Sequence, residues 1–195
     1  METLIPRWEW RAFNAGFSGT GNPFAALEPG GVEESDELYL LSPRSDVNVK
    51  IRGRLMDIKR LEQVNSDRLE QWKPVMKGAF PLPRAEAGRV LTTLGLIPPA
   101  LARAEYTIGQ FVAELAPPGG HLRALQVHKT RTHYKVEGCM AELADIVAEG
   151  RTTSTIAIES EDPSQVTAAV RTLGLDLQGN VNYPRGLKTL VGMIG

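Results

Sequence analysis

A row of cationic residues in the stretch VNVKIRGRLMDIKRLE is the feature of the sequence that most clearly points to chemistry. Read as an extended strand, it places Lys50, Arg52 and Arg54 on one face and apolar side chains on the other, because successive strand residues point to opposite faces. Arginine binds phosphate oxygens in a bidentate fashion, and lysine supplies a compact positive charge. The pattern is therefore typical of a strand that binds a phosphorylated anion.

Charged residues also alternate in two other stretches, RWEWRAF and VHKTRTHYK. If the first is a strand, Arg7, Glu9 and Arg11 share one face and the two tryptophans share the other. In the second stretch, Lys129 and Arg131 share a face in the same way. Several strands thus offer charged faces, and most of their charges are positive.

The chemistry of these faces depends on what neutralises them. Burying unpaired cations together costs several kcal/mol for each ion, and a polyanionic ligand would remove that cost. Carboxylates on the same side, such as Glu159 in TTSTIAIESE, would then fit Mg²⁺ or Mn²⁺, which bridge phosphate oxygens. The alternative is a set of solvated strand faces whose opposite charges pair across neighbouring strands.

Four early segments are predicted to be strands, because they are short, mostly alternate and end at turn-forming residues. They span residues 7–15, 37–43, 47–54 and 55–64. The segment between the first two, Gly16 to Asp36, is rich in glycine, proline and glutamate. We expect it to be an exposed loop.

The remaining elements predict an α+β fold. RAEAGRVLTTLGL and YTIGQFVAEL have apolar stripes at helical spacing, and three further strands are predicted at residues 122–138, 139–150 and 152–162. The next helix has Asp162 as N-cap, Pro163 at its first position and Gln165 at the capping-box position. A short helix around YPRGLKTLVG follows. This order favours an antiparallel sheet over repeated βαβ units, in a single domain of residues 1–195.

The composition excludes some classes of protein. With 22 Lys and Arg against 23 Asp and Glu, the net charge of -1 does not drive the chain onto nucleic acid or anionic membranes. The single cysteine, Cys139, excludes an internal disulfide and a multi-thiolate metal site. No signal peptide and no stretch of the ~18 apolar residues of a membrane helix is evident. We therefore expect a globular cytoplasmic protein that has no membrane partner.

The C-terminal part of the sequence resembles a known family. The run KVEGCMAELADIVAEGRTTSTIAIESEDPSQVTAAVRTLGL, followed by NVNYPRGLKTL, is similar to the second half of the CYTH domain, also called the triphosphate tunnel metalloenzymes. There an acidic residue on one strand, a glutamate ending the next, a helix with a Leu-Gly-Leu exit and a tyrosine-containing last helix follow in this order. VNVKIRGRLMDIKRLE resembles the family's two strands of alternating basic residues followed by a lysine.

The resemblance implies an antiparallel β-barrel of about eight strands with helices packed outside. The interior of this barrel would form a tunnel that holds a triphosphate between basic residues and a divalent metal bound by glutamates. The phosphate contacts that it implies are Arg11, Lys50, Arg52, Lys59, Lys129 and Arg131. The metal contacts that it implies, for Mg²⁺ or Mn²⁺, are Glu9, Glu142 and Glu159.

Two carboxylates of the family's pattern are missing from this chain. The family opens with Glu-x-Glu-x-Lys, whereas RWEWR has Arg7 in place of the first glutamate, keeps Glu9 and has Arg11 in place of the lysine. The family often has Glu-x-Glu at the end of the later acidic strand, where this chain has Ala157 and Glu159. The row of phosphate contacts therefore matches the family better than the set of metal ligands does.

Three hypotheses about function follow. The first is an enzyme that hydrolyses inorganic triphosphate or a related organic triphosphate with Mg²⁺ or Mn²⁺. The second is a catalytically degenerate protein of the same fold that binds polyphosphate, a nucleotide or a phosphorylated metabolite. The third is an interaction or structural module in which the polar lumen holds internal ion pairs only.

Overall fold

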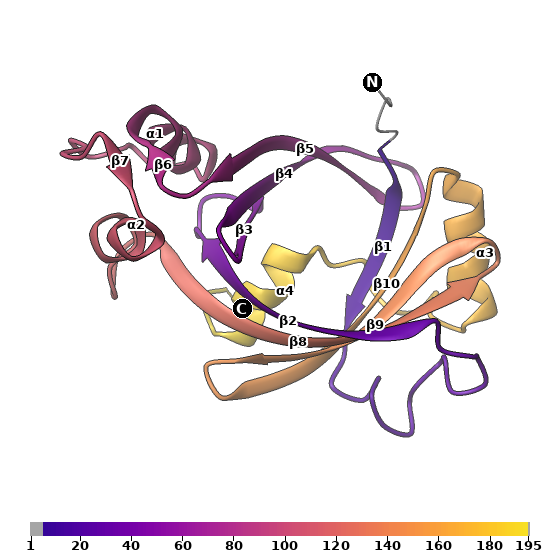
Figure 1. Ribbon diagram of the computed structural model, residues 1–195. Helices are drawn as coiled ribbons and strands as arrows, with labels where there is room; N and C mark the ends of the chain where they lie inside the picture. Colours follow the sequence, from indigo (N-terminus) through magenta and orange to yellow (C-terminus); the bar gives the residue numbers. More distant parts are fainter. Residues whose placement is uncertain (1–5, 195) are drawn as a thin grey trace.

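The strands of the chain close into an antiparallel barrel, described for residues 6–194 by a computed structural model (Figure 1). The barrel strands are β1 (Trp8–Phe13), β2 (Gly31–Leu41), β3 (Asn48–Arg52), β4 (Leu55–Val64), β5 (Glu70–Ala79), β8 (Arg123–Val136), β9 (Cys139–Ala148) and β10 (Arg151–Ser160). They pair in the order β1-β10-β9-β8-β2-β3-β4-β5, and β1 also pairs with β5. The prediction of an antiparallel barrel of eight strands is confirmed.

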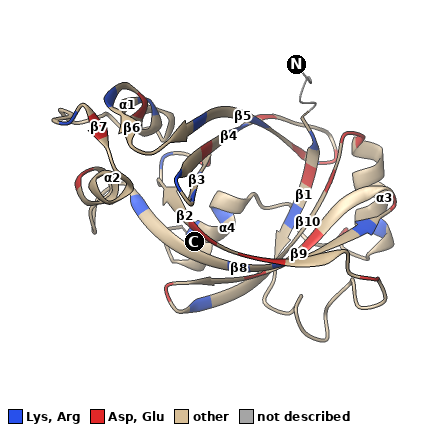
Figure 2. Ribbon diagram, in the orientation of Figure 1, with Lys and Arg blue, Asp and Glu red and all other residues tan. Residues whose placement is uncertain are grey.

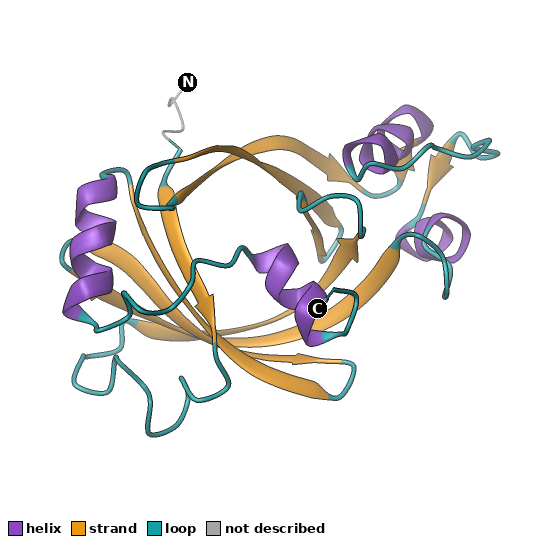
Figure 3. Ribbon diagram, turned by 180° about the vertical axis from the view of Figure 1, so that it is seen from behind, coloured by secondary structure: helices purple, strands orange, loops and turns teal. Residues whose placement is uncertain are grey.

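Within residues 6–194, four helices accompany the barrel: α1 (Arg84–Thr93), α2 (Ile108–Leu115), α3 (Pro163–Thr172) and α4 (Tyr183–Leu190). A small second sheet pairs β6 (Leu82–Pro83) with β7 (Glu105–Tyr106). Figures 1 and 3 show α3 on one side of the barrel, α1 and α2 on the other, and α4 across one end of the ring. In the described part of the chain, every helix is too short or too polar to cross a membrane.

Helix α3 packs on the outside of β1, β9 and β10. It starts as the sequence predicts, with Pro163 in its first turn and the Asp162 carboxylate accepting a hydrogen bond from the Ser164 N–H. The capping-box prediction for Gln165 is wrong, because its side-chain oxygen accepts a hydrogen bond from Ser160 instead. The buried stripe of α3 meets Trp10 of β1, so the tryptophan face of RWEWRAF is an outer face.

Helices α1 and α2 cover the outer face of β2, β3 and β4. The apolar face of VNVKIRGR lies in this layer, since Val49 and Ile51 are buried against Phe111 and its neighbours. The Thr107 hydroxyl accepts a hydrogen bond from the N–H of Gln110, whose side chain completes a capping box at the start of α2. The cationic face of β3 must therefore point into the barrel.

Helix α4 closes one end of the barrel from the inside. Tyr183 and Leu187 pack against apolar inner-face residues of β2, β8 and β9. A Cβ atom at Gly186 would lie 2.2 Å from the ring of Phe13, so only glycine allows this close approach to β1. Lys188 is 2% exposed and donates to the Ser45 carbonyl at 2.8 Å and to Asp46 Oδ1 at 2.5 Å, which fixes the helix in place.

The structure corrects three predictions about elements. The loop expected from Gly16 to Asp36 is shorter, because β2 already begins at Gly31. Strand β5 was not predicted; its Pro74 lies beside the register shift after Ile58, where a missing N–H is tolerated. Arg54 does not join the cationic face, since it lies in the turn after β3 and donates to the Phe80 carbonyl at 3.0 Å.

Candidate functional site

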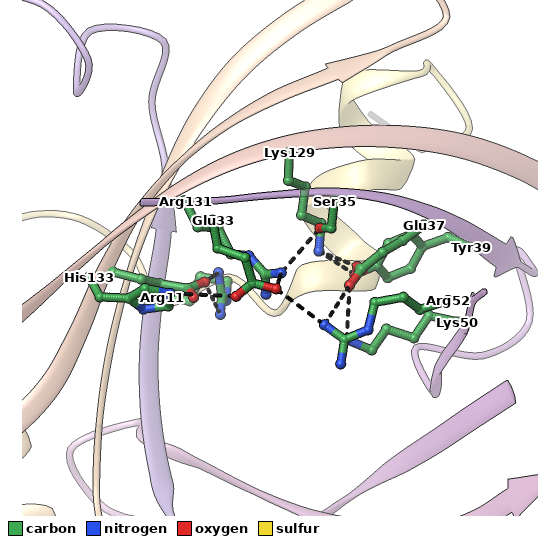
Figure 4. A network of polar contacts seen from close by, with 11 residues as sticks. Arg11, Glu33, Ser35, Glu37, Tyr39, Lys50, Arg52, Lys129, Arg131 and His133 are labelled. Carbon is green, nitrogen blue, oxygen red and sulfur yellow. Dashed lines mark hydrogen bonds and ion pairs between the residues drawn. The ribbon is translucent and has the colours of Figure 1, made fainter. Parts of the chain in front are cut away.

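Alternate residues of the barrel strands form a polar network on the inner face (Figure 4). The members that Figure 4 labels are Arg11, Glu33, Ser35, Glu37, Tyr39, Lys50, Arg52, Lys129, Arg131 and His133. The exposed fraction of the side chains falls from 55% at Arg52 and 49% at Glu33 to 0% at Glu37. Solvent therefore reaches one level of the network, while the level next to α4 is closed.

The closed level is a cluster of Glu37, Tyr39, Lys50 and Lys129, which we call the floor cluster. Lys129 Nζ lies 2.6 Å from Glu37 Oε2 and 2.6 Å from the Tyr39 hydroxyl oxygen. The Tyr39 hydroxyl donates to Glu37 at 2.8 Å, and Lys50 Nζ lies 3.3 Å from the other Glu37 oxygen. Tyr39 stacks on Tyr183 of α4, with ring centroids 5.2 Å apart. Lys129, a predicted phosphate contact, is thus already paired with a buried carboxylate.

Glu37 is ionised in this cluster. Burial alone would raise the pKa of its carboxyl group, but the charges of Lys129 and Lys50 outweigh burial and lower the pKa to about 2. The single negative charge of Glu37 is thus compensated inside the floor cluster, where two amino groups and a hydroxyl hold its carboxylate. We therefore assign the floor cluster to the structure of the barrel.

The solvent-reached level contains a second carboxylate, Glu33. Its oxygens lie 3.0 Å from Arg131 Nη2, 3.6 Å from Arg52 Nη1 and 3.7 Å from His133 Nε2. Arg131 also donates to the Ser35 hydroxyl at 3.1 Å. The Nε of Arg131 is buried and has no hydrogen-bond partner among residues 6–194. These arginines are therefore only partly satisfied by the protein.

The opposite wall carries three glutamates on β1, β9 and β10. Glu9 and Glu159 face each other across the β1–β10 pair, and Glu142 is the β9 partner of Ala157. Arg11 lies between them, with Nε 2.9 Å from Glu9 and Nη1 3.3 Å from Glu142. Figure 2 shows acidic and basic residues together on β1. This wall is therefore a set of ion pairs built around a buried arginine.

The electrostatics of the glutamates follow from these arginines. Burial alone would raise the pKa of Glu142, but Arg11 and Lys129 outweigh burial and lower it. Burial and the neighbouring charge of Glu9 raise the pKa of Glu159, although Arg11 and Arg7 oppose the change. Arg7 Nη1 lies 3.6 Å from Glu159, in a half-exposed pair. Each of the three predicted metal ligands thus has a guanidinium group beside it.

A divalent metal does not fit this arrangement. Mg²⁺ and Mn²⁺ need several free oxygen ligands at one point. Arg11 is bonded to Glu9 and Glu142, and Arg7 lies on Glu159. Within residues 6–194, no three His, Cys, Asp or Glu side chains gather in a way that could hold a metal ion. The structure does not bring the expected metal ligands together as a metal site.

Lys59 is the predicted phosphate contact for which the structure shows no ion-pair partner within residues 6–194. It is the β4 partner of Asn48, which shares the inner face of β3 with Lys50. Lys59 is exposed and forms no ion pair within the described part of the chain. Among the predicted cations, Arg52 and Arg131 contact Glu33 at the solvent-reached level, and Lys50 and Lys129 belong to the floor cluster. Lys59 lies at the register of Asn48, on the far side of Lys50 from Arg52.

Sequence reasoning missed Glu33 and Glu37, although both are central to the network. The predicted loop extended to Asp36 because of its acidic, glycine-rich composition, and Glu37 began the next predicted strand without a role in the site. The signal that could have identified them is the period of two, since Glu33, Ser35 and Glu37 alternate with outward-facing residues. Extending that alternation toward the N-terminus would have placed both carboxylates opposite the cations of β8.

Comparison with known proteins finds similarity in structure only. No family model matches the sequence, and no curated protein is similar to it. A candidate adenylyl cyclase from Hippeastrum with a dominant triphosphatase activity matches with a TM-score of 0.51 and 14% identity, over 95% of this chain and 96% of that protein. A conserved hypothetical protein from Pyrococcus furiosus matches with a TM-score of 0.49 and 17% identity, over 91% and 98%. A candidate adenylate cyclase from Bacillus halodurans matches with a TM-score of 0.47 and 12% identity, over 92% and 96%.

The likeness to the Hippeastrum protein extends over nearly the whole of both chains, and it shows the fold. The chain has the closed eight-stranded barrel of the CYTH, or triphosphate tunnel, fold. The fold that the sequence resemblance implied is therefore confirmed.

Proposed function

We propose that this chain binds a triphosphate-containing compound or polyphosphate on the inner face of its barrel. The observation that supports the proposal is the gathering of cations from separate strands on that face. Arg52 and Arg131 contact Glu33 at the solvent-reached level, and Lys59 is exposed on β4 at the register of Asn48. Arginine and lysine form short, charge-assisted hydrogen bonds with phosphate oxygens. The triphosphatase activity of the Hippeastrum protein, which shares the fold, is consistent with this ligand class.

The ligand's phosphoryl groups would contact Arg52, Arg131 and Lys59 directly. The amino groups of Lys50 and Lys129 already pair with Glu37, so these lysines would not bond the ligand directly. They would contribute positive electrostatic potential from the floor cluster. Arg11 would stabilise the far end of the ligand while remaining bonded to Glu9 and Glu142. The phosphate contacts implied by the resemblance thus divide into groups that touch the ligand and groups that shape the field around it.

The substitution Lys59→Gln is expected to weaken tripolyphosphate binding about tenfold, since it removes one charge-assisted contact. The matched control is Arg60→Gln, which removes the same charge from the next residue of β4; Arg60 is exposed and forms no ion pair within residues 6–194. Isothermal titration calorimetry measures both affinities. Equal affinities for the two variants would contradict the contact. If tripolyphosphate, nucleoside triphosphates and thiamine triphosphate all fail to bind or stabilise the protein, the proposed function is wrong.

We further propose that binding does not require a divalent metal. Guanidinium groups stand where the resemblance places the metal, so the positive charge on that wall comes from the protein itself. The second hypothesis, a binding protein without metal-dependent hydrolysis, is the one that the geometry favours.

Removal of metal is therefore expected to leave the tripolyphosphate affinity unchanged within about threefold, or to raise it, because Mg²⁺ in solution competes by neutralising the ligand. Calorimetric titrations in EDTA and in excess Mg²⁺ make the comparison, and a phosphate-release assay with Mg²⁺ or Mn²⁺ runs beside them. Binding that disappears in EDTA, or metal-dependent release of phosphate, would instead favour the first hypothesis, a triphosphatase.

A further inference from the structure

Strand β2 carries three glutamates in three different environments. Glu37 is fully buried in the floor cluster. Glu34 lies on the outer face, is exposed and forms no ion pair within the described residues. Glu33 lies on the inner face with 49% of its side chain exposed and pairs with Arg52 and Arg131. Only Glu33 combines contact with the solvent-reached cations and the freedom to move away from them.

The pairing of Glu33 leaves its arginines incompletely bonded. Glu33 accepts a hydrogen bond from Nη2 of Arg131, while the buried Nε on the same edge of the guanidinium has no partner among residues 6–194. Arg52 Nη1 lies 3.6 Å from Glu33, which is beyond hydrogen-bond length. A phosphoryl group presents three oxygens and can bond Nε and Nη2 together in a bidentate fashion. A phosphoryl group can therefore accept two hydrogen bonds from this edge of Arg131, whereas the carboxylate of Glu33 accepts one.

We infer that Glu33 determines which anions bind, because its carboxylate is the counterion that an incoming ligand must replace. This inference rests on the proposed function. The side chain of Glu33 is 49% exposed, and ion pairs of such solvent-accessible carboxylates are weak, so a ligand can displace it. The tethered carboxylate competes at an effective concentration on the order of millimolar, which a ligand with a single phosphoryl group, such as orthophosphate, does not overcome. A polyphosphate replaces Glu33 at both Arg131 and Arg52, so polyanions are selected.

The test is to titrate Glu33→Gln with orthophosphate and with tripolyphosphate by calorimetry, in EDTA. Glutamine keeps the size of the side chain and removes its charge. Tripolyphosphate is expected to bind about fivefold tighter or more, and orthophosphate binding is expected to become measurable. Glu34→Gln is the matched control, since it changes the net charge equally on the outer face of the same strand; its affinities are expected to equal those of the wild type.

The possible outcomes are distinguishable. Unchanged affinity in Glu33→Gln overturns the inference while leaving the proposed function intact if the wild type binds tripolyphosphate. Weaker affinity also overturns it, because Glu33 would then belong to the binding contacts. Tighter binding of tripolyphosphate by Glu33→Gln than by the wild type supports the inference. If neither protein binds any phosphate compound, the inference and the proposed function both fail.

Discussion

Replacing Glu37 by glutamine is expected to lower the free energy of unfolding by about 3–5 kcal/mol, because breaking a buried ion pair leaves a charge without its partner. Lys129 is 4% exposed, and its amino group has Glu37 and the Tyr39 hydroxyl as its bonded neighbours. Glutamine keeps the shape of the side chain but not its charge. Lys129 must then lose its proton or remain charged beside a neutral amide.

Chemical denaturation measures this loss of stability. Glu34→Gln, on the outer face of the same strand, is expected to change the free energy of unfolding by about 0.5 kcal/mol at most. Adding Lys129→Met to Glu37→Gln is expected to restore part of the loss, since the unpaired charge is then removed. A loss under about 1 kcal/mol for Glu37→Gln would show that the floor cluster does not stabilise the fold as proposed.

The same carboxylate predicts how stability depends on pH. The pKa of Glu37 is lowered from 4.5 to about 2 in the folded protein, so the folded state binds its proton less readily than the unfolded state does. The stabilisation is therefore complete above pH 4.5 and is lost as the pH falls toward 2. Between pH 4.5 and 2, the free energy of unfolding should fall more steeply with decreasing pH for the wild type than for Glu37→Gln. Parallel curves would contradict the assignment.

The second large effect is expected in ligand binding. The double substitution Arg52→Gln and Arg131→Gln should weaken tripolyphosphate binding by about 100-fold or more, because each charged hydrogen bond that is lost contributes about 1.5–3 kcal/mol. Both side chains contact Glu33; Arg52 is 55% exposed, and Arg131, which is 12% exposed, retains an unbonded Nε among the described residues. Calorimetry measures the affinity directly.

The control for this variant removes two positive charges from elsewhere on the surface. Arg60→Gln with Arg89→Gln serves this purpose, since both arginines are exposed and form no ion pair within residues 6–194. The thermal midpoint of the Arg52 and Arg131 double variant should stay close to that of the wild type, because the side chain of Glu33 is half exposed and tolerates losing its partners. An affinity no weaker than that of the control would place the ligand away from these arginines.

Much of the fold could be predicted from the sequence, because it depends on local patterns. The period of two in VNVKIRGR assigned Lys50 and Arg52 to one face and Val49 to the other, as the barrel has them. The start of α3 at Asp162 was predicted from its capping residue and proline. Strand β5 was missed because Pro74 interrupts its pattern. Composition misled the prediction for the first half of β2, which is acidic and begins with glycine.

Alternation along each strand determines which face a side chain occupies. For this reason the sequence alone placed Lys50 and Arg52 together on one polar face. The partner of each charge was decided only by the tertiary structure. Glu33 meets Arg131, 98 residues away, because β2 pairs with β8 in one register. Arg11 joins Glu9 to Glu142, 131 residues away, because β10 lies between β1 and β9. Charge compensation depends on distances between strands, and a repeat along one strand carries no information about the register of another.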